Sequence, residues 1–313
     1  MAHISVMRDR CVELLAPVVA LSDRPVIVDA TLGLGGHTEA LLTSFPTLTV
    51  IGIDRDAIAI ARATERLAQF GERFKSAHVV FDEISSVVAS FGFSQINGAL
   101  FDLGVSSMQL DEAERGFSYS HDAPLDMRMD TSCGITAAEI LNTYEPGKLV
   151  QILRTYGEEK FATRIVENIV KARSKSPLNS TAHLAALVKE SIPAATRRTG
   201  GNPAKRTFQA LRIEANDELG AISRALPQAL NLLLVHGRLV VMSFQSLEDR
   251  IVKEIFTEAS TSKSPRNLPV ELPEFAAKFS LIFRSSQTPS ERELAENPRS
   301  ASVRLRAIER VAA

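Results

Sequence analysis

The sequence contains no tryptophan and only two cysteines, Cys11 and Cys133, among its 313 residues. Two cysteines exclude a disulfide framework, and neither they nor the six scattered histidines show metal-ligand spacing. No apolar run reaches the length of about 20 residues that crosses a bilayer. The first ten residues, "MAHISVMRDR", lack the apolar core of a signal peptide. We therefore expect a cytoplasmic protein that holds no metal and has no membrane association.

Net charge is also nearly absent, at −1, but the charges are unevenly distributed. Residues 148–213 carry 13 basic and 4 acidic side chains, whereas residues 1–147 carry 10 basic and 20 acidic ones. A basic segment inside an otherwise acidic chain is typical of a domain that faces a polyanion such as nucleic acid. A solvated helical face is the alternative interpretation of the same pattern.

Apolar, β-branched runs alternate with helical patterns in the first third of the chain. Four such runs occupy residues 26–31, 48–54, 76–81 and 96–104. Near-continuous apolar strands separated by helices indicate an α/β fold, with a parallel sheet that is covered on both faces. Further strands are expected at residues 237–244, 278–284 and 302–310.

The pattern changes after the fourth strand. Residues 105–135 are polar and irregular, and the helical stretches that follow are not interrupted by a strand pattern until residue 237. We therefore predict a mostly helical insertion domain at residues 109–213, between two strands of one sheet built by residues 1–108 and 214–313. A helix over residues 204–234 leads back to the sheet, and Pro227 is expected to end or kink it.

The segment "VIVDATLGLGGHTEALL" (residues 26–42) predicts a strand, a glycine turn and the start of a helix. Gly33 and Gly35 match a dinucleotide-binding fingerprint, but Thr38 stands where the third glycine should be. Asp54, at the end of the second strand, is placed to accept both ribose hydroxyls of an adenosine cofactor. The missing glycine argues against a pyrophosphate and favours S-adenosylmethionine, although a tight turn that binds nothing is the simpler alternative.

Several long motifs raise the specificity of this interpretation. The sequence resembles the family of ribosomal RNA small subunit methyltransferases H over nearly its whole length. The resemblance is carried, in order, by "DATLGLGGHT", "DLGVSSMQLDEAERGFSYSHDAPLDMRMD", "YGEEKFATRIVENIV", "NPAKRTFQALRIEANDEL", "GRLVVMSFQSLEDRIVK" and "NPRSASVRLRAIER". It implies a Rossmann-like methyltransferase sheet with a helical insertion domain, and S-adenosylmethionine as cofactor. It also implies methylation of N4 of a cytidine in the decoding region of 16S rRNA within the small ribosomal subunit.

The same resemblance assigns cofactor contacts by position. They fall on Gly35, Gly36, His37, Asp54, Phe81, Asp102 and Gln109. For Phe81 the alternative is ordinary core packing, and for Gln109 it is a solvated loop. Asp102 is also the candidate catalytic residue, because an acceptor for an N4–H would localise the lone pair of the amine. The alternative is that Asp102 contacts only the cofactor and takes no part in catalysis.

Three positions depart from the family pattern, which usually has His at Gln245, usually Pro at Met108 and often His at Asn202. Glutamine takes up no proton near neutral pH. We expect that a base at position 245 is not obligatory, because the methylated nitrogen is acidic enough to lose its proton to water.

Charged residues of the insertion suggest two roles. A basic cluster in "ATRRTGGNPAKRTFQALR" is assigned to the rRNA backbone, namely Arg197, Arg198, Lys205, Arg206 and Arg212. A second set is expected to form ion pairs that shape the loop after the fourth strand, in preference to the alternative of a direct role in catalysis, namely Asp111, Arg115, Asp126, Arg128 and Asp130. Two other classes remain open at this point: a nicotinamide-dependent oxidoreductase, and a non-catalytic rRNA-binding or assembly protein that retains a methyltransferase fold.

Overall fold

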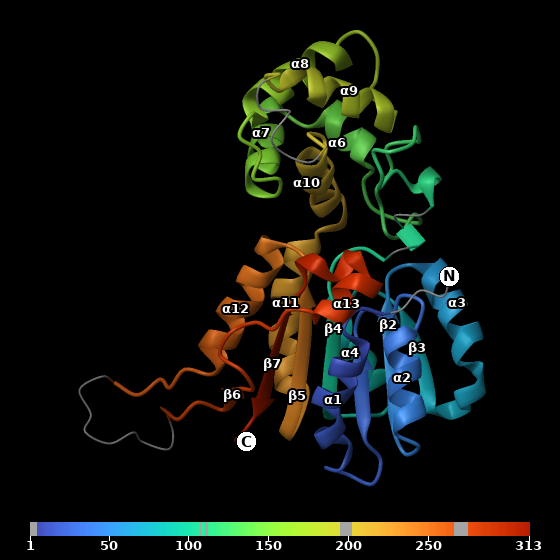
Figure 1. Ribbon diagram of the computed structural model, residues 1–313, viewed down its shortest axis with the longest axis vertical. Coiled ribbons are helices and arrows are strands. Elements are labelled where there is room, and N and C mark those ends of the chain that lie inside the picture. The colour runs from blue at the N-terminus through green and yellow to red at the C-terminus, as the bar shows by residue number, and fades with distance from the viewer. Residues whose placement is uncertain (1–4, 107, 110–111, 195–201, 266–274) are drawn as a thin grey trace. The chain divides into compact units, whose positions relative to one another are not determined.

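The computed structural model divides the chain into two compact units (Figure 1). It describes residues 5–106, 108–109, 112–194, 202–265 and 275–313. The first unit comprises Met1–Gly104 and Leu219–Ala313, and the second comprises Val105–Glu218. The sequence-based division set the boundaries after residues 108 and 213 instead.

The first unit is built on a seven-stranded sheet with the order β3-β2-β1-β4-β5-β7-β6. Its strands are β1 (Val26–Asp29), β2 (Thr49–Asp54), β3 (Phe74–His78), β4 (Ile96–Asp102), β5 (Leu233–Ser243), β6 (Phe279–Leu281) and β7 (Arg304–Arg310). The first five strands are parallel, whereas β7 is antiparallel to both β5 and β6. The chain runs outward from β1 to β3 and then returns to β4, so the strand order reverses between β1 and β4. Ligands of open α/β sheets bind at such a reversal, outside the carboxyl ends of the strands.

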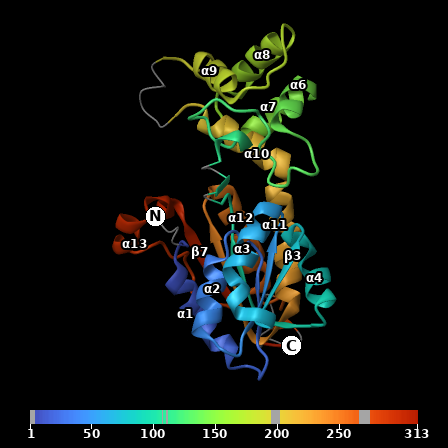
Figure 2. The same ribbon diagram turned by 90° about the vertical axis from the view of Figure 1, so that its right-hand side faces the viewer.

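Helices cover both faces of this sheet (Figure 2). They are α1 (Arg8–Val19), α2 (Gly36–Ser44), α3 (Ala57–Leu67), α4 (Ile84–Ser90), α11 (Glu218–Leu232) and α12 (Ser246–Ala259). The unit also contains α13 (Glu291–Glu296) and the short 3₁₀ turns η1 (Ala68–Arg73), η2 (Phe81–Glu83) and η6 (Pro298–Ser302). Adjacent residues of β4 serve different cores: Leu100 packs with the α1 side and Phe101 with the α11 side. This double burial explains why β1, β2 and β4 read as apolar runs, and it confirms the predicted α/β class. Half-buried β3 lies at Phe74–His78 and not at the predicted residues 76–81.

The second unit has its own apolar core, assembled from five helices. They are α6 (Ala137–Thr143), α7 (Pro146–Thr155), α8 (Ala162–Arg173), α9 (Thr181–Ser191) and α10 (Lys205–Asn216), preceded by the 3₁₀ turn η3 (Ala113–Arg115). Thr136 and Glu139 begin α6 with a reciprocal capping box, and Pro146 occupies the first turn of α7, where its missing N–H costs nothing. The predicted helical character of this segment is therefore confirmed.

Two details of the chain path differ from the prediction. The expected helix over residues 204–234 is broken at Asp217, whose φ of 47° ends α10, whereas α11 continues through Pro227. Strand β5, which was expected to begin at residue 237, begins at Leu233. The pairing of β4 with β5 shifts register between Ile96–Leu233 and Gly98–Arg238, so the extra residues of β5 form an irregularity there, in which His236 has a φ of 68°. No helix in the described ranges has the length and apolarity to span a membrane.

Candidate active site

The glycine turn joins β1 to α2 at the reversal of strand order. Gly35 is the N-cap of α2 with a φ of 76°, a left-handed conformation that favours glycine. A Cβ at Gly35 would also approach Cδ1 of Leu67 to 2.9 Å. The N–H groups in the first turn of a helix have no intrahelical acceptor, so the start of α2 offers donors to an anionic group such as a carboxylate.

Thr38 does more than interrupt a glycine fingerprint. Its side chain is fully buried, and Oγ1 donates a hydrogen bond of 2.7 Å to Oδ2 of Asp29, the last residue of β1. Burial raises the pKa of Asp29 from 3.8 to about 6, although hydrogen bonds from Thr38 and Thr31 oppose the shift. No pattern in the sequence indicates this pair, because Thr38 stands out there only as the residue that replaces a third glycine.

Asp54 lies at the carboxyl end of β2, as predicted, and its carboxylate holds the glycine turn. Oδ2 accepts a 2.7 Å hydrogen bond from the N–H of Gly33, and Oδ1 accepts one of 2.9 Å from the N–H of Asp56. Burial raises the pKa of Asp54 from 3.8 to about 6, against the effect of those two hydrogen bonds. A carboxylate has about four acceptor positions, so Asp54 retains capacity for two ribose hydroxyls.

Asp102 lies at the carboxyl end of β4, next to β1. Its Oδ1 is buried and has no hydrogen-bond partner among the residues that the structure describes. Burial raises the pKa of Asp102 from 3.8 to about 6; His37 opposes this shift, and the charges of Asp29 and Glu248 add to it. A buried carboxylate oxygen without a hydrogen-bond partner is a strong acceptor for a donor group of a ligand.

The structure places His37 beside Asp102, but its ring already has a protein partner. Nε2 lies 2.9 Å from the carbonyl oxygen of Val6, and Nδ1 lies 3.8 Å from Oδ2 of Asp102. The ring is buried in the first turn of α2. Because Nε2 meets the Val6 carbonyl, Nδ1 is the ring nitrogen for the predicted contact of His37 with the cofactor, which stays a prediction.

Phe81 and Gln109 occupy different parts of the chain. Phe81 begins η2 and packs edge-to-face on Phe101 with ring centroids 5.7 Å apart, while its side chain remains partly exposed. Gln109 belongs to the second unit, where its Oε1 accepts a 3.1 Å hydrogen bond from the N–H of Ser106. The cofactor contacts of both residues remain predictions.

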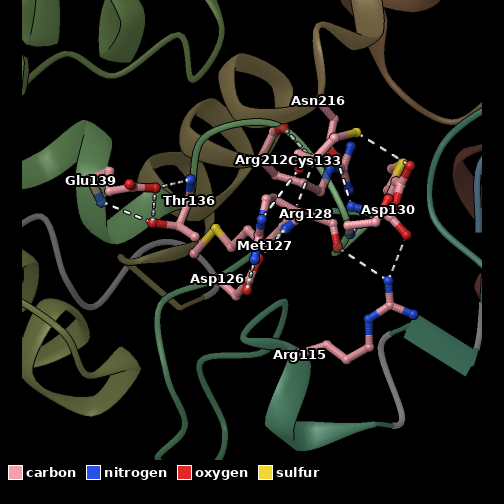
Figure 3. A network of polar contacts seen from close by, with 12 residues as sticks. Arg115, Asp126, Met127, Arg128, Asp130, Cys133, Thr136, Glu139, Arg212 and Asn216 are labelled. Carbon is pink, nitrogen blue, oxygen red and sulfur yellow. Dashed lines mark hydrogen bonds and ion pairs between the residues drawn. The ribbon is translucent and has the colours of Figure 1, made fainter.

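The predicted ion-pair network of the second unit exists in part (Figure 3). Arg128 and Asp126 form a two-pronged pair with both N···O distances at 2.8 Å. Arg115 instead donates to backbone carbonyls, those of Arg128 and Met129. Asp130 accepts hydrogen bonds from Ser132 and Cys133. Asp111 lies outside the described residues.

Asn216, the last residue of α10, fastens this loop to the helix. Its side-chain amide donates to the carbonyl of Met127 at 2.7 Å and accepts from the N–H of Met129 at 2.7 Å (Figure 3). The arrangement orders the backbone rather than presenting catalytic groups. The preferred interpretation of this charged set, a shaped loop, therefore agrees with the contacts.

The basic cluster assigned to RNA divides into different environments. Lys205 and Arg206 are exposed at the start of α10. Arg212 is largely buried in a two-pronged pair with Glu218, at 2.8 and 3.0 Å. Its assignment to phosphate binding is therefore wrong, because its guanidinium already neutralises a protein carboxylate. Arg197 and Arg198 lie outside the described residues.

The parallel sheet, its glycine turn and the acids at the ends of β1, β2 and β4 define a Rossmann-like methyltransferase. Comparison with known families agrees. The model described as "MraW methylase family" matches residues 1–311, and the chain belongs to this family. This membership removes the oxidoreductase alternative and disfavours the non-catalytic one.

Curated relatives match over almost the whole chain. A protein from Saccharopolyspora erythraea is 56% identical over 310 residues, covering 99% of this chain and 93% of the relative. A protein from Salinispora arenicola is 54% identical, covering 99% of this chain and 83% of the relative. Both are named "Ribosomal RNA small subunit methyltransferase H". Among solved structures, an rRNA methylase from Streptococcus thermophilus aligns over 99% of both chains, with a TM-score of 0.42 and 13% identity.

Proposed function

We propose that this protein transfers a methyl group from S-adenosylmethionine to N4 of a cytidine in the decoding region of 16S rRNA. The observation that carries the proposal is the buried, unpartnered Oδ1 of Asp102 at the reversal of strand order. An exocyclic amine is a donor that suits this acceptor. The relatives that match along the whole chain carry the name of an rRNA small subunit methyltransferase, which supports the choice of acceptor.

The residues present suit S-adenosylmethionine better than a dinucleotide. Buried Thr38, hydrogen-bonded to Asp29, stands at the third glycine of the dinucleotide fingerprint, the glycine that lets the helix pack closely on the strand. The first turn of α2 offers N–H donors for the methionine carboxylate, and Asp54 offers oxygens for the ribose. Phe81 and Gln109 are proposed to contact the adenine and the adjoining part of the cofactor. When bound, this cofactor supplies a methyl group that its sulfonium already activates.

The chain's task is then to position and polarise the amine. The N4 lone pair of cytosine is delocalised into the ring, so N4 is a weak nucleophile. Asp102 accepts a hydrogen bond from N4–H, which localises the lone pair and stabilises the positive charge that develops on nitrogen. The cofactor, held by the first turn of α2 and by Asp54, would supply the methyl group to N4 and would keep the electron pair of the broken carbon–sulfur bond on its sulfur. One N4 proton then passes to water. The in-line alignment of these atoms supplies most of the acceleration, and the base is flipped out of its stack to reach the site.

Small ribosomal subunits from a strain that lacks this gene provide the direct test. They are incubated with the protein and S-adenosylmethionine that carries a labelled methyl, and the rRNA is digested to nucleosides. We expect label in N4-methylcytidine. Label in another nucleoside would contradict the proposed acceptor, and no label with tight cofactor binding would support the non-catalytic alternative.

The pH dependence of kcat/KM for the cofactor provides a second prediction. Burial holds the pKa values of Asp54 and Asp102 at about 6, and both act as carboxylates. We expect log kcat/KM to rise between about pH 5 and pH 7 with a slope above one, because two groups of the free enzyme must ionise. Asp102→Asn should reduce this limb to a slope of one. A profile that is flat from pH 5 to pH 7 would show that neither carboxylate must be ionised.

The second unit is proposed to bind the rRNA backbone through exposed basic residues. The double variant Lys205→Glu with Arg206→Glu is expected to weaken rRNA binding about tenfold. It should also make the dependence of log Kd on log salt shallower by about 1.5, as expected when two phosphate contacts are lost. Binding is measured by filter retention from 50 to 300 mM salt, about the range in which counterion release is largest. Exposed Lys253 and Lys278 of the first unit, reversed together, provide a control with equal charge change. An unchanged salt slope would remove this assignment.

A further inference from the structure

Asp29, the last residue of β1, is the most deeply buried of the three acids at the carboxyl edge of the sheet. Its relative exposure is 1%, whereas Asp54 and Asp102 remain partly exposed. Its carboxylate accepts hydrogen bonds from two neutral donors, Oγ1 of Thr38 at 2.7 Å and the N–H of Thr31 at 3.4 Å. Among the described residues, no basic side chain forms an ion pair with Asp29. Asp29 also has no role in the proposed transfer of the methyl group.

The strand register places Asp29 between the other two acids. Its Cα partners are Gly52 of β2 and Leu100 of β4. Asp54 and Asp102 therefore each lie one strand across and two residues further on, a separation of about 8 Å by ordinary strand spacing. The charge of Asp29 accordingly contributes to the raised pKa values of both Asp54 and Asp102. A ligand that occupies this edge of the sheet is therefore exposed to the charge of all three carboxylates.

A buried carboxylate of this kind calls for a cationic ligand. Burial raises the pKa of Asp29 to about 6, so the group is still ionised at pH 8. Proteins bury a charge mainly where a partner of opposite sign accompanies it. S-adenosylmethionine, the cofactor of this family of methylases, has such a charge, because its sulfonium and ammonium groups together outweigh its carboxylate. S-adenosylhomocysteine, the product that remains after methyl transfer, has a neutral thioether in place of the sulfonium and no net charge.

We propose that Asp29 is a specificity-determining residue of the cofactor site, and that its charge favours cationic S-adenosylmethionine over the neutral product S-adenosylhomocysteine. The carboxylate acts through space, because each of its oxygens already accepts a hydrogen bond from the chain. Loss of the sulfonium charge then weakens the binding of the spent cofactor and favours its exchange. This inference rests on the proposed cofactor contacts at the glycine turn and Asp54, and not on the choice of N4 as the methyl acceptor.

Asp29→Asn is the sharpest test, because it removes the charge and keeps an amide oxygen for Thr38. At pH 8 we expect the Kd for S-adenosylmethionine to rise about 10- to 30-fold, the effect of removing one charge at about 8 Å in a partly screened site. The Kd for S-adenosylhomocysteine should stay within about twofold, because that ligand has no net charge. Sinefungin, which has an ammonium group where the cofactor has its sulfonium, should be weakened as much as S-adenosylmethionine. Calorimetric titration gives the three Kd values without turnover.

Two further variants separate charge from packing. Thr38→Val removes the shortest hydrogen bond of Asp29 but keeps its charge, so the ratio of the Kd values for product and cofactor should stay within about threefold of the wild type. Asp23→Asn, at an exposed position just before β1, makes the same chemical exchange and should change neither Kd.

The charge role of Asp29 is overturned if Asp29→Asn weakens all three ligands equally, or changes none of them. It is also overturned if Thr38→Val changes the ratio as much as Asp29→Asn does, because the hydrogen bond and not the charge would then be responsible. A protein that shows the expected Kd values but forms no N4-methylcytidine would refute the proposed acceptor and leave the role of Asp29 intact.

Discussion

Replacement of Asp102 by asparagine is expected to lower kcat for methyl transfer about 100- to 1000-fold at pH 8, the range found when one preorganised acceptor or donor at a reacting centre is removed. The amide removes the negative charge that stabilises the developing positive charge on N4, and its NH₂ group competes with the amine for space. Because Oδ1 has no partner in the described structure, the exchange breaks no hydrogen bond of that atom. Single-turnover measurements at saturating cofactor isolate the chemical step.

The unfolding temperature of Asp102→Asn distinguishes a loss of catalysis from a loss of folded protein. A carboxylate whose pKa is raised from 3.8 in the unfolded chain to about 6 in the native state binds its proton more tightly in the native state. Its contribution to stability is therefore fully present below about pH 4 and is lost as the pH rises through 6, a change of about 3 kcal/mol. At pH 8, Asp102→Asn should consequently unfold at the same or a higher temperature than the wild type.

Two outcomes would contradict the role given to Asp102. A normal kcat with a weakened Kd for S-adenosylmethionine would show that Asp102 serves only the cofactor. A normal kcat with a normal Kd would remove Asp102 from the site altogether. Asp23→Asn, at an exposed position of the first unit, gives the control for the same chemical exchange.

The parts of the site that follow from local sequence were predictable. A strand that ends in an acid brings that acid to the ligand-binding edge of a parallel sheet, so the sequence placed Asp54 and Asp102 correctly at strand ends. The glycine turn was equally local, because Gly35 requires a left-handed backbone where α2 begins. The positions of β1, β2 and β4 were predicted because burial on both faces leaves a continuous apolar run, whereas half-buried β3 was placed two residues late.

Features that depend on distant partners could not be predicted. His37 meets the carbonyl of Val6, 31 residues earlier, and no pattern around the glycine turn indicates that contact. Arg212 appeared to belong to a basic cluster because charge was counted along the chain, whereas Glu218 neutralises it in space.

The helix break at Asp217 illustrates a different limit. An aspartate with a φ of 47° occupies a conformation that is usually reserved for glycine, so the sequence pattern favoured one uninterrupted helix. Nearby contacts constrain this part of the chain, since Arg212 of α10 pairs with Glu218, the first residue of α11. Helical periodicity detects the apolar face of each helix but not the left-handed residue at which α10 ends.

Replacement of Asp54 by asparagine is expected to raise the Kd for S-adenosylmethionine about 100-fold, while kcat at saturating cofactor stays within a few-fold of the wild type. Two charge-assisted hydrogen bonds to the ribose would be lost or weakened, each worth about 1.5 to 3 kcal/mol. In the wild type, Oδ2 of Asp54 accepts a 2.7 Å hydrogen bond from the N–H of Gly33. An amide NH₂ in place of Oδ2 would set two donors against each other and lose this hydrogen bond. Calorimetric titration gives the Kd, and saturation kinetics give kcat.

The neighbouring acid provides the control for this prediction. Asp56 is the N-cap of α3 and accepts a hydrogen bond from the N–H of Ile58. Asp56→Ala should lower the free energy of unfolding by about 1 kcal/mol, the usual cost of a lost N-cap, and leave the Kd nearly unchanged. If Asp54→Asn bound the cofactor within threefold of the wild type, Asp54 would only hold the glycine turn. The ribose would then need another acceptor at this edge of the sheet.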